Sequence, residues 1–261
     1  MKKLLTIAIA LVLVAAVATA SAATLVIGAS STPHAEILEA AKDLLAAKDI
    51  TLDIIIFDDY VQPNLQLDAG DLDANYFQHI PYLEDFCAQN GTKLVSAGAV
   101  HYEPMGIYTN LEKAYTIDAI PDGAVIAVPN DPTNEARALA LLAAQGLITL
   151  DVAAGQTATV LDIAENPKNV EIQEFEAAAV PRMLADVDLA VINSNYALEA
   201  GVEVVGTAIA VEGTDITFPN IVAIREGDDR AELKTLVEVL QSEEMVNWIT
   251  TTYGTAVCPT K

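Results

Sequence analysis

The sequence predicts an α/β protein with mainly parallel sheets. Short apolar segments with strand character alternate with segments whose apolar residues recur at helical spacing along most of the 261 residues. Apolar residues make up 52% of the chain, which excludes an intrinsically disordered protein despite the net charge of −24. The length suffices for one large domain or for two lobes, each with its own core.

Residues 1–22 have the composition of an export signal. Met1-Lys2-Lys3 is followed by the almost wholly apolar Leu4–Val17 and by Ala20-Ser21-Ala22, a small-x-small pattern that signal peptidase cleaves. We expect cleavage after Ala22. An uncleaved anchor is the alternative, because no charged residue occurs between Lys3 and Glu36. In both cases the protein is extracytoplasmic, in the periplasm or on the outer face of the cell membrane.

The segments that follow the signal alternate strand and helix. Leu25–Gly28 is a short apolar strand, and Ser31-Thr32-Pro33 is expected to begin a helix with a hydroxyl cap and an early proline. Leu52–Phe57 is an Ile-rich strand that we expect to be buried on both faces. Leu72–Phe77 is a third strand, and Pro81–Cys87 is a helix that Asn90-Gly91 ends.

The second half of the chain continues this alternation. The expected strands are Ala124–Val128, Val170–Phe175, Leu189–Ile192 and Asn220–Arg225, and the expected helices are Thr133–Gln145, Ala178–Leu184, Ala231–Leu240 and Glu243–Thr250. The sequence shows no internal repeat and no low-complexity linker. Two lobes would therefore be joined by strands or tight crossovers rather than by a flexible tether.

The acidic composition excludes two classes of partner. Thirteen Lys plus Arg stand against 37 Asp plus Glu. Nucleic acids and anionic membranes are not expected as partners, because neutralising phosphates requires clustered basic residues. The chain has four arginines, Arg137, Arg182, Arg225 and Arg230. An anionic ligand must be held by one of these, by a lysine or by backbone amides.

The segment Val128–Arg137 combines a strand end, a turn stiffened by two prolines and a helix start with Thr133 or Asp131 as its cap. The free amides at a helix start carry partial positive charge and suit a carboxylate. Arg137, in the first turn or so of this helix, can add a forked pair of donors. A capped helix with a solvated arginine is the alternative.

Three other segments bring polar or aromatic side chains to strand ends, where open α/β sheets bind ligands. In Asp71–His79, two aromatic rings and His79 can wall an apolar pocket that contacts a thioether, although one ring is expected in the core. Glu103 could meet an ammonium group or lie in a turn. Asn193 and Asn220 offer amides that both donate and accept hydrogen bonds.

The sequence contains no catalytic signature of the nucleophile-elbow, phosphate-loop or His-Glu-x-x-His kind. His34, His79 and His101 could form a three-histidine metal site, but they lie on separate segments without ligand spacing, so we expect no metal, cofactor or catalytic residue. Cys87 and Cys258 lack the close spacing of a zinc motif. One disulfide and two separate thiols remain equally compatible with the sequence.

Together these motifs resemble the substrate-binding proteins of methionine ABC importers, the NlpA lipoprotein family. The similar segments are, in chain order, Phe57–Asn64, Gly70–His79, His101–Gly106, Val128–Arg137, Glu165–Asn169, Val180–Arg182 and Ala190–Ala197. The resemblance implies a two-lobed type II periplasmic-binding fold, with flanking helices and a ligand cleft that closes by a hinge. Residues 23–106 and 217–261 would form lobe I, and residues 107–216 lobe II.

The resemblance also implies a ligand, L-methionine with D-methionine as a further candidate, and the residues that bind it. Arg137 would hold the ligand carboxylate, Asn193 and Asn220 its other backbone groups, and Glu103 its ammonium group. Tyr60, Phe77 and His79 would line the side-chain pocket, and Asn134 would belong to the same site. The protein would be monomeric and would deliver its ligand to an ABC permease and the cytoplasmic ATPase.

Two alternatives remain open, and one feature departs from the family. The ligand could be a methionine-containing dipeptide or another apolar amino acid, and an enzyme on the same fold is the less favoured reading. Members of the family usually carry a lipobox cysteine at the end of the signal, whereas Ala22-Ala23-Thr24 has none. A lipid anchor at this point is therefore not expected.

Overall fold

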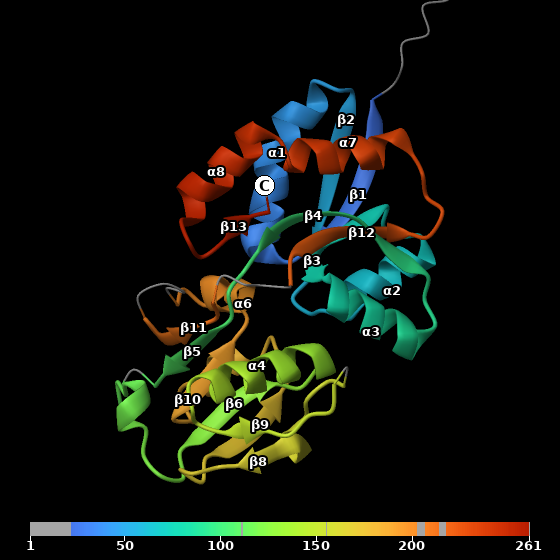
Figure 1. Ribbon diagram of the computed structural model, residues 1–261. Helices are drawn as coiled ribbons and strands as arrows, with labels where there is room; N and C mark the ends of the chain where they lie inside the picture. Colours follow the sequence, from blue (N-terminus) through green and yellow to red (C-terminus); the bar gives the residue numbers. More distant parts are fainter. Residues whose placement is uncertain (1–21, 111, 155, 203–206, 214–217, 261) are drawn as a thin grey trace, which may run out of the picture.

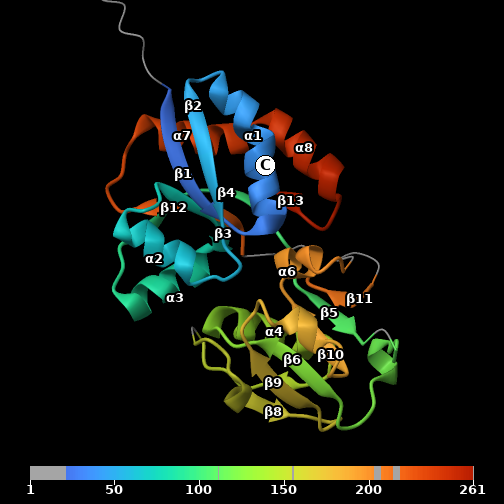
Figure 2. The same cartoon turned by 180° about the vertical axis from the view of Figure 1, so that it is seen from behind.

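The computed structural model describes residues 22–110, 112–154, 156–202, 207–213 and 218–260, which form two lobes, each built on one sheet (Figures 1 and 2). Residues 1–21 of the expected signal lie outside the described residues. Among the helices in the described ranges, none is long and apolar enough to cross a membrane.

Lobe I is a three-layer unit around a six-stranded sheet in the order β13-β4-β12-β3-β1-β2. The strands are β1 (Ala23–Ala29), β2 (Ile50–Ile56), β3 (Ala74–His79), β4 (Leu94–Tyr102), β12 (Asn220–Arg225) and β13 (Cys258–Pro259). One face is covered by α1 (Glu36–Ala46), α7 (Ala231–Leu240) and α8 (Glu243–Tyr253), and the other by α2 (Gln62–Ala69) and α3 (Ile80–Asn90). The apolar faces of these helices bury both sides of the sheet.

Lobe II has the same layering around a five-stranded sheet in the order β11-β5-β10-β6-β9. Its strands are β5 (Gly106–Thr109), β6 (Val125–Pro129), β9 (Glu171–Phe175), β10 (Leu189–Ile192) and β11 (Ala208–Val211). Helix α4 (Pro132–Ala144) packs on one face, and α5 (Val180–Met183) and α6 (Ser194–Glu199) on the other. The smaller elements are η1 (Ser31–Ala35), η2 (Ile117–Ala119), η3 (Val160–Asp162) and the pair β7 (Thr149–Leu150) and β8 (Ile163–Glu165).

Each sheet has a parallel half and an antiparallel half. The strands β3, β1 and β2, like β10, β6 and β9, pair in parallel. The strands that lead across between the lobes, β4, β5, β11 and β12, pair antiparallel with their neighbours. The prediction of mainly parallel sheets therefore holds for one half of each sheet, the half whose strands are connected through helices. The crossing strands need no crossover helix and can run antiparallel.

Two local predictions are wrong. The regular helix begins at Glu36 rather than at Ser31-Thr32-Pro33, because Thr32 keeps extended dihedral angles (φ −130°, ψ 135°), as a residue before proline prefers. Strand β2 is not buried on both faces, since it is the edge strand of its sheet and Ile56 is 55% exposed. An Ile-rich run predicts a strand but does not tell a central strand from an edge strand.

Both cysteines are free thiols. Cys87 lies on α3, with its Sγ 3.7 Å from the carbonyl oxygen of Leu94. Cys258 lies on β13, with its Sγ 3.5 Å from the carbonyl oxygen of Thr255. Of the two arrangements that the sequence left open, the structure has two separate thiols.

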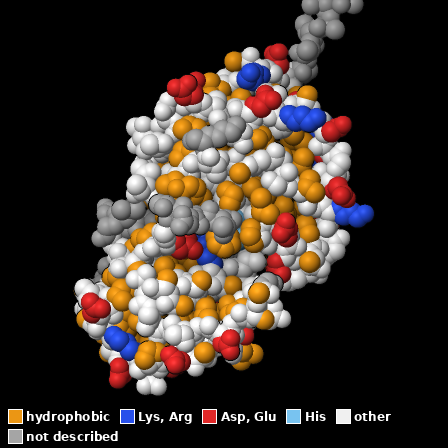
Figure 3. Space-filling model, in the orientation of Figure 1, with side chains coloured by type: hydrophobic (Ala, Val, Ile, Leu, Met, Phe, Trp, Pro, Cys, Tyr) orange, Lys and Arg blue, Asp and Glu red, His pale blue; other side chains and the backbone are white. Residues whose placement is uncertain are grey.

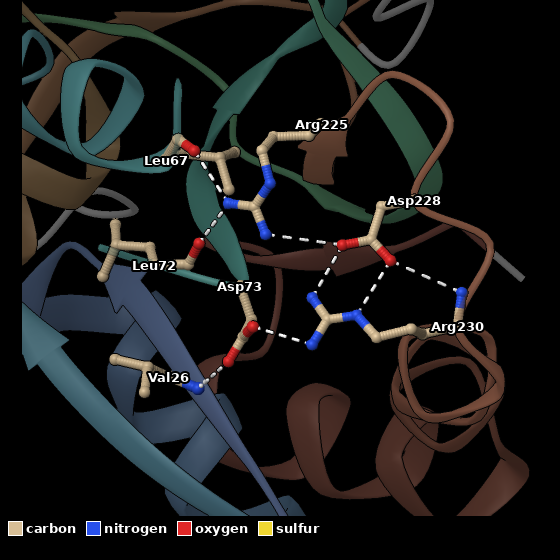
Figure 4. A network of polar contacts seen from close by, with 7 residues as sticks. All are labelled: Val26, Leu67, Leu72, Asp73, Arg225, Asp228 and Arg230. Carbon is tan, nitrogen blue, oxygen red and sulfur yellow. Dashed lines mark hydrogen bonds and ion pairs between the residues drawn. The ribbon is translucent and has the colours of Figure 1, made fainter. Parts of the chain in front are cut away.

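Two of the four arginines belong to a polar network in lobe I (Figure 4). Arg225 Nη1 donates to the carbonyl oxygens of Leu67, at 2.8 Å, and Leu72, and thereby ties β12 to the end of α2. Asp228 accepts hydrogen bonds from Arg230, which hold the pKa of this carboxyl group below its usual value. The stabilising contribution of Asp228 is therefore complete at pH values above the ordinary pKa of an aspartate. It is lost as the pH falls through the lowered pKa.

Arg230 extends this network to the start of the sheet. Its Nη1 lies 2.8 Å from a carboxylate oxygen of Asp73, and the other oxygen of Asp73 accepts the backbone N–H of Val26 at 2.8 Å. A third arginine, Arg182, is exposed on α5. Three of the four arginines are thus structural or exposed, and Arg137 is the one left for a ligand site.

Replacing Arg225 with Met is expected to lower the free energy of unfolding by about 1–2 kcal/mol, because two buried carbonyl groups lose their donor. Urea denaturation followed by circular dichroism measures this change. Arg182→Met is the matched control and should stay within about 0.5 kcal/mol of wild type. Equal stabilities of the two variants would contradict the structural role of Arg225.

Candidate ligand-binding site between the lobes

A pocket lies between the lobes and is lined by side chains from both of them. All of the predicted site residues line this cavity: Tyr60, Phe77, His79, Glu103, Asn134, Arg137, Asn193 and Asn220. They come from β3 and β12 of lobe I, from α4 and the end of β10 in lobe II, and from the loops around them. The structure therefore brings together side chains that are far apart in the sequence.

Arg137 is buried on α4. Its side chain contacts both segments in which the chain passes between the lobes: the first crossing, between β4 and β5 at Glu103, and the second crossing, between β11 and β12 at Glu212. Its Nε and Nη2 form a forked ion pair with Glu212, at 2.7 and 2.6 Å, and Nη2 also donates to the main-chain oxygen of Glu103 at 2.6 Å. The ring of Phe218 lies 5.0 Å from the guanidinium carbon. Because no described residue contacts Nη1, this nitrogen is the donor that Arg137 retains for a ligand.

Glu212 was missed by the sequence analysis. It follows β11 directly, and its carboxylate also accepts the backbone N–H of Met105 at 2.6 Å. Nothing in the local sequence distinguishes Glu212 among 37 acidic residues. Only the approach of the second crossing to α4 reveals that it pairs with Arg137.

The start of α4 is not free to bind an anion, which corrects one prediction. Asp131, rather than Thr133, is the cap, and its Oδ1 accepts the backbone N–H of Asn134 at 3.0 Å. The carboxylate of Asp131 therefore already occupies the amide that the sequence pattern assigned to a ligand. The side chain of Arg137 remains the candidate anion-binding group of this segment.

The cap also fixes the amides that face the cavity. The Nδ2 of Asn134 donates to both carboxylate oxygens of Asp131, at 2.9 and 3.0 Å, so that its Oδ1 points away as an acceptor. This oxygen lies 2.8 Å from Asn193 Nδ2 and 3.3 Å from His79 Nε2. His79 Nδ1 accepts the backbone N–H of Tyr82 at 3.1 Å, which leaves Nε2 as the protonated nitrogen. Burial, followed by the charge of Arg137, lowers the pKa of His79 to about 3, so the ring is neutral.

Two buried amide atoms at the cavity have no hydrogen-bond partner among the described residues. They are the acceptor Oδ1 of Asn193 and the donor Nδ2 of Asn195, in side chains that are 8% and 3% exposed. A buried polar atom without a partner costs free energy, about 1–3 kcal/mol. A ligand that both donates and accepts hydrogen bonds would satisfy both atoms.

Aromatic rings form the lobe I wall of the cavity. Tyr60 lies with its ring centroid 5.7 Å from those of both Phe77 and Tyr82, and its hydroxyl donates to Asn195 Oδ1 at 2.6 Å across the lobes. Tyr76, on the opposite face of β3, packs in the lobe I core. The prediction that one of the two neighbouring rings is a core residue is therefore confirmed, and Phe77 is the ring that faces the cavity.

Glu103 is buried in the first crossing beside two histidines. Its Oε1 lies 2.8 Å from His101 Nε2 and 3.4 Å from His34 Nε2. Burial lowers the pKa of His34 to about 4 and that of His101 to about 3, so that both rings are neutral. Burial also raises the pKa of Glu103, against the influence of His34 and Arg137. Glu103 is thus a buried acid whose nearest partners carry no charge.

The three-histidine site considered from the sequence does not form, because His79 lies apart from His34 and His101. In its place, ligand atoms of His34, His101 and Glu103 lie within 4.8 Å of one another, which is the chemistry of a small metal site. The contacts among the described residues are those of a hydrogen-bonded network. His101 Nε2 has Glu103 as its partner, whereas His34 Nε2 has Asn220 Oδ1, at 3.2 Å, and lies near Glu103.

Comparison with known proteins identifies close relatives. Residues 25–261 match the family described as NlpA lipoprotein. The methionine-binding lipoprotein MetQ of Bacillus subtilis (strain 168) is 42% identical over 241 residues, which are 90% of this chain and 87% of MetQ.

Two solved structures are similar over their whole length. A nutrient-binding protein from Burkholderia cenocepacia bound to methionine is 43% identical, with a TM-score of 0.86 over 91% of this chain and 100% of that one. An ABC transporter periplasmic substrate-binding protein from Coxiella burnetii is 40% identical, with a TM-score of 0.85 over 90% of this chain and 99% of that one.

Proposed function

Because the chain belongs to the NlpA lipoprotein family, we propose that it is the substrate-binding protein of an ABC importer and that it binds methionine between its lobes. It is a binding protein and not an enzyme. The observation that carries the proposal is a set of groups at the cavity. Arg137 Nη1, the Asn195 donor and the Asn193 acceptor have no hydrogen-bond partner among the described residues, and the side-chain partners of the Glu103 carboxyl group are two neutral histidines. These groups complement the two ends of an amino-acid zwitterion.

The ligand carboxylate would bind Arg137 Nη1, with further donors from Asn195 Nδ2 and Asn220 Nδ2. Asn220 uses its Oδ1 for His34, which leaves the amino group for the ligand. Glu212 already pairs with Arg137, so the remaining donor Nη1 would hold the ligand carboxylate by a charge-assisted hydrogen bond and not by an unshared ion pair. Charge-assisted hydrogen bonds of this kind are among the strongest that a protein makes.

The ligand ammonium group would bind Glu103 and Asn193 Oδ1. With Arg137 paired to Glu212 and both histidines neutral, Glu103 is the charged group without a counterion at the cavity. A cation supplied by the ligand offsets this buried charge, which a neutral ligand would not do. The site therefore favours an amino acid over an uncharged or purely anionic molecule.

The thioether side chain would lie against Tyr60, Phe77, His79 and Tyr82. Aromatic rings give sulfur favourable contacts of about 0.3–1.5 kcal/mol and also bury its apolar neighbours. Hydrogen bonds from Tyr60 to Asn195 and from Tyr196 to the main chain of Asp58 join the lobes beside this wall. Closing the cleft around the ligand would complete the pocket.

Isothermal titration of the mature protein, unfolded and refolded to remove any carried ligand, tests this function. We expect saturable heat with L-methionine and one site per chain. D-methionine, methionine-containing dipeptides and leucine, tested alongside, distinguish methionine from the alternative ligands. Absence of heat with L-methionine would refute the proposal.

The partners and the location follow from the same function. The protein would act as a monomer that delivers methionine to a membrane permease with its cytoplasmic ATPase. It would be exported by residues 1–22, which contain no cysteine.

A further inference from the structure

A chain of buried polar groups leads from the lobe I core to Glu103. The hydroxyl of Tyr76, on β3, is hydrogen-bonded to His101 Nδ1, and His101 Nε2 lies 2.8 Å from Glu103 Oε1. His34, from η1, lies 3.4 Å from the same oxygen and 3.2 Å from Asn220 Oδ1. The side chains of Tyr76, His34 and His101 are at most 1% exposed, and none of the three lines the ligand cavity.

The contacts determine which nitrogen of each histidine carries the proton. Tyr76 has no other described hydrogen-bond partner, so its hydroxyl donates to His101 Nδ1 and the proton of the neutral ring is on Nε2. His34 Nε2 faces only the oxygens of Glu103 and Asn220, so it too carries the proton, and Nδ1 has no partner. His101 Nε2 therefore donates to Glu103 Oε1, whereas His34 Nε2 donates to Asn220 Oδ1 and lies 3.4 Å from the same carboxylate oxygen.

The remaining groups around Glu103 do not replace these donors. Arg137 exerts its positive charge but binds the main-chain oxygen of Glu103 and the carboxylate of Glu212. The backbone N–H of Asn195 is a further donor. Tyr60 and Tyr253 also lie within electrostatic range, and their raised pKa values keep them neutral at physiological pH.

We propose that Tyr76, His101 and His34 are positioning residues that hold Glu103 as a carboxylate and thereby set the pH range over which the ammonium group of the ligand is bound. This inference rests on the proposed function. Hydrogen bonds to the charged form of an acid favour that form, and burial opposes it. The hydrogen bond from His101 and the nearby N–H dipole of His34 thus counteract burial without adding a positive charge that would repel the ammonium group.

Removing the hydroxyl of Tyr76 should release the proton of His101 to either nitrogen. With the proton on Nδ1, the lone pair of Nε2 would face Glu103 and favour the protonated acid as its hydrogen-bond donor. The pKa of Glu103 would rise. Because the carboxylate is the form that binds an ammonium group, methionine affinity would then begin to fall at a higher pH.

The experiment compares Tyr76→Phe with Tyr108→Phe. Tyr108 is equally buried, in lobe II, and its hydroxyl has no partner among the described residues, so the control removes the same atom outside the network. Methionine affinity is measured by titration calorimetry from pH 5 to pH 8. Methionine affinity is expected to fall on the acid side of this range, and we call this part of the profile the acid limb. In Tyr76→Phe we expect the acid limb to lie at least about half a pH unit higher than in wild type, which is a further threefold loss of affinity at low pH. Unshifted limbs in both variants would overturn the proposal.

A second pair of variants tests His34. In His34→Gln the side-chain amide can keep an N–H near the position of Nε2, whereas His34→Leu cannot donate at all. We expect His34→Gln to keep the acid limb of wild type and His34→Leu to move it upward. Circular dichroism confirms that both fold. A purely structural role for His34 would lower stability without moving the limb.

A measurement without ligand separates the failure of this inference from failure of the proposed function. Nitrogen-15 NMR of the imidazole rings should show His34 and His101 neutral and protonated on Nε2 from pH 5 to pH 8. In Tyr76→Phe the signals of His101 should indicate Nδ1 protonation or a mixture. Titration of either histidine near pH 6.5 in wild type, or an unchanged His101 in Tyr76→Phe, would overturn the network whether or not methionine binds.

Discussion

Replacing Arg137 with Ala is expected to weaken methionine binding at least about 30-fold, which corresponds to about 2 kcal/mol. The variant loses Nη1, the donor that remains for the ligand carboxylate. It also leaves the partly buried Glu212 without its cation, which makes the surroundings of the cavity more anionic and disfavours a carboxylate. Titration calorimetry with L-methionine measures the loss.

Three further variants separate ligand binding from folding. Arg182→Ala removes an exposed arginine and should bind as wild type does. Arg137→Ala combined with Glu212→Gln removes the stranded charge and should restore stability but not affinity. Arg137→Lys keeps the charge but not the forked geometry and should bind weakly. Wild-type affinity in the double variant would place the carboxylate site elsewhere.

Replacing Asn220 with Ala is expected to cost at least about 2 kcal/mol of methionine affinity, the scale of a lost buried polar partner. Asn220 stands at the first position of β12 and connects His34 to the cavity. The change removes the proposed donor to the ligand and leaves His34 with Glu103 as its single acceptor. Calorimetry gives the affinity, and thermal unfolding shows whether lobe I remains intact.

Asn220→Asp and Asn247→Ala are the controls for this variant. The aspartate keeps the size of the side chain and the acceptor for His34, but it replaces the amino group with an oxygen and adds a negative charge, so it should also bind weakly. Asn247 is exposed on α8, and its replacement should have no effect. If Asn220→Asp bound methionine as wild type does, Asn220 would not donate to the ligand.

The acidic composition proves less informative about the ligand than the scarcity of arginine. On the face shown in Figure 3, acidic side chains are scattered over both lobes with a few basic ones among them. At the cavity, Arg137 pairs with Glu212, and Glu103 lies beside two neutral histidines. The overall charge therefore describes the surface, whereas the site depends on three ionisable side chains.

Local sequence patterns determined most helices and strands. The bounds of β10, β12 and α7 agree with prediction, and Gly91, with φ 70°, ends α3 as Asn90-Gly91 predicted. These signals are local, because the spacing of apolar residues, helix caps and glycines with left-handed dihedral angles each act within a few residues. For the same reason, the polar residues at strand ends were recognised as site candidates before their positions in space were known.

The tertiary structure alone decided how these parts meet. The sequence analysis did not predict β4 or β5, the strands of the first crossing, because their partners come from distant parts of the chain. Glu212 meets Arg137 across 75 residues, and His34 meets Asn220 across 186. Pairing of this kind depends on sheet order and on the approach of the lobes. Sequence periodicity reports which residues are buried, and only the fold reports which buried groups face one another.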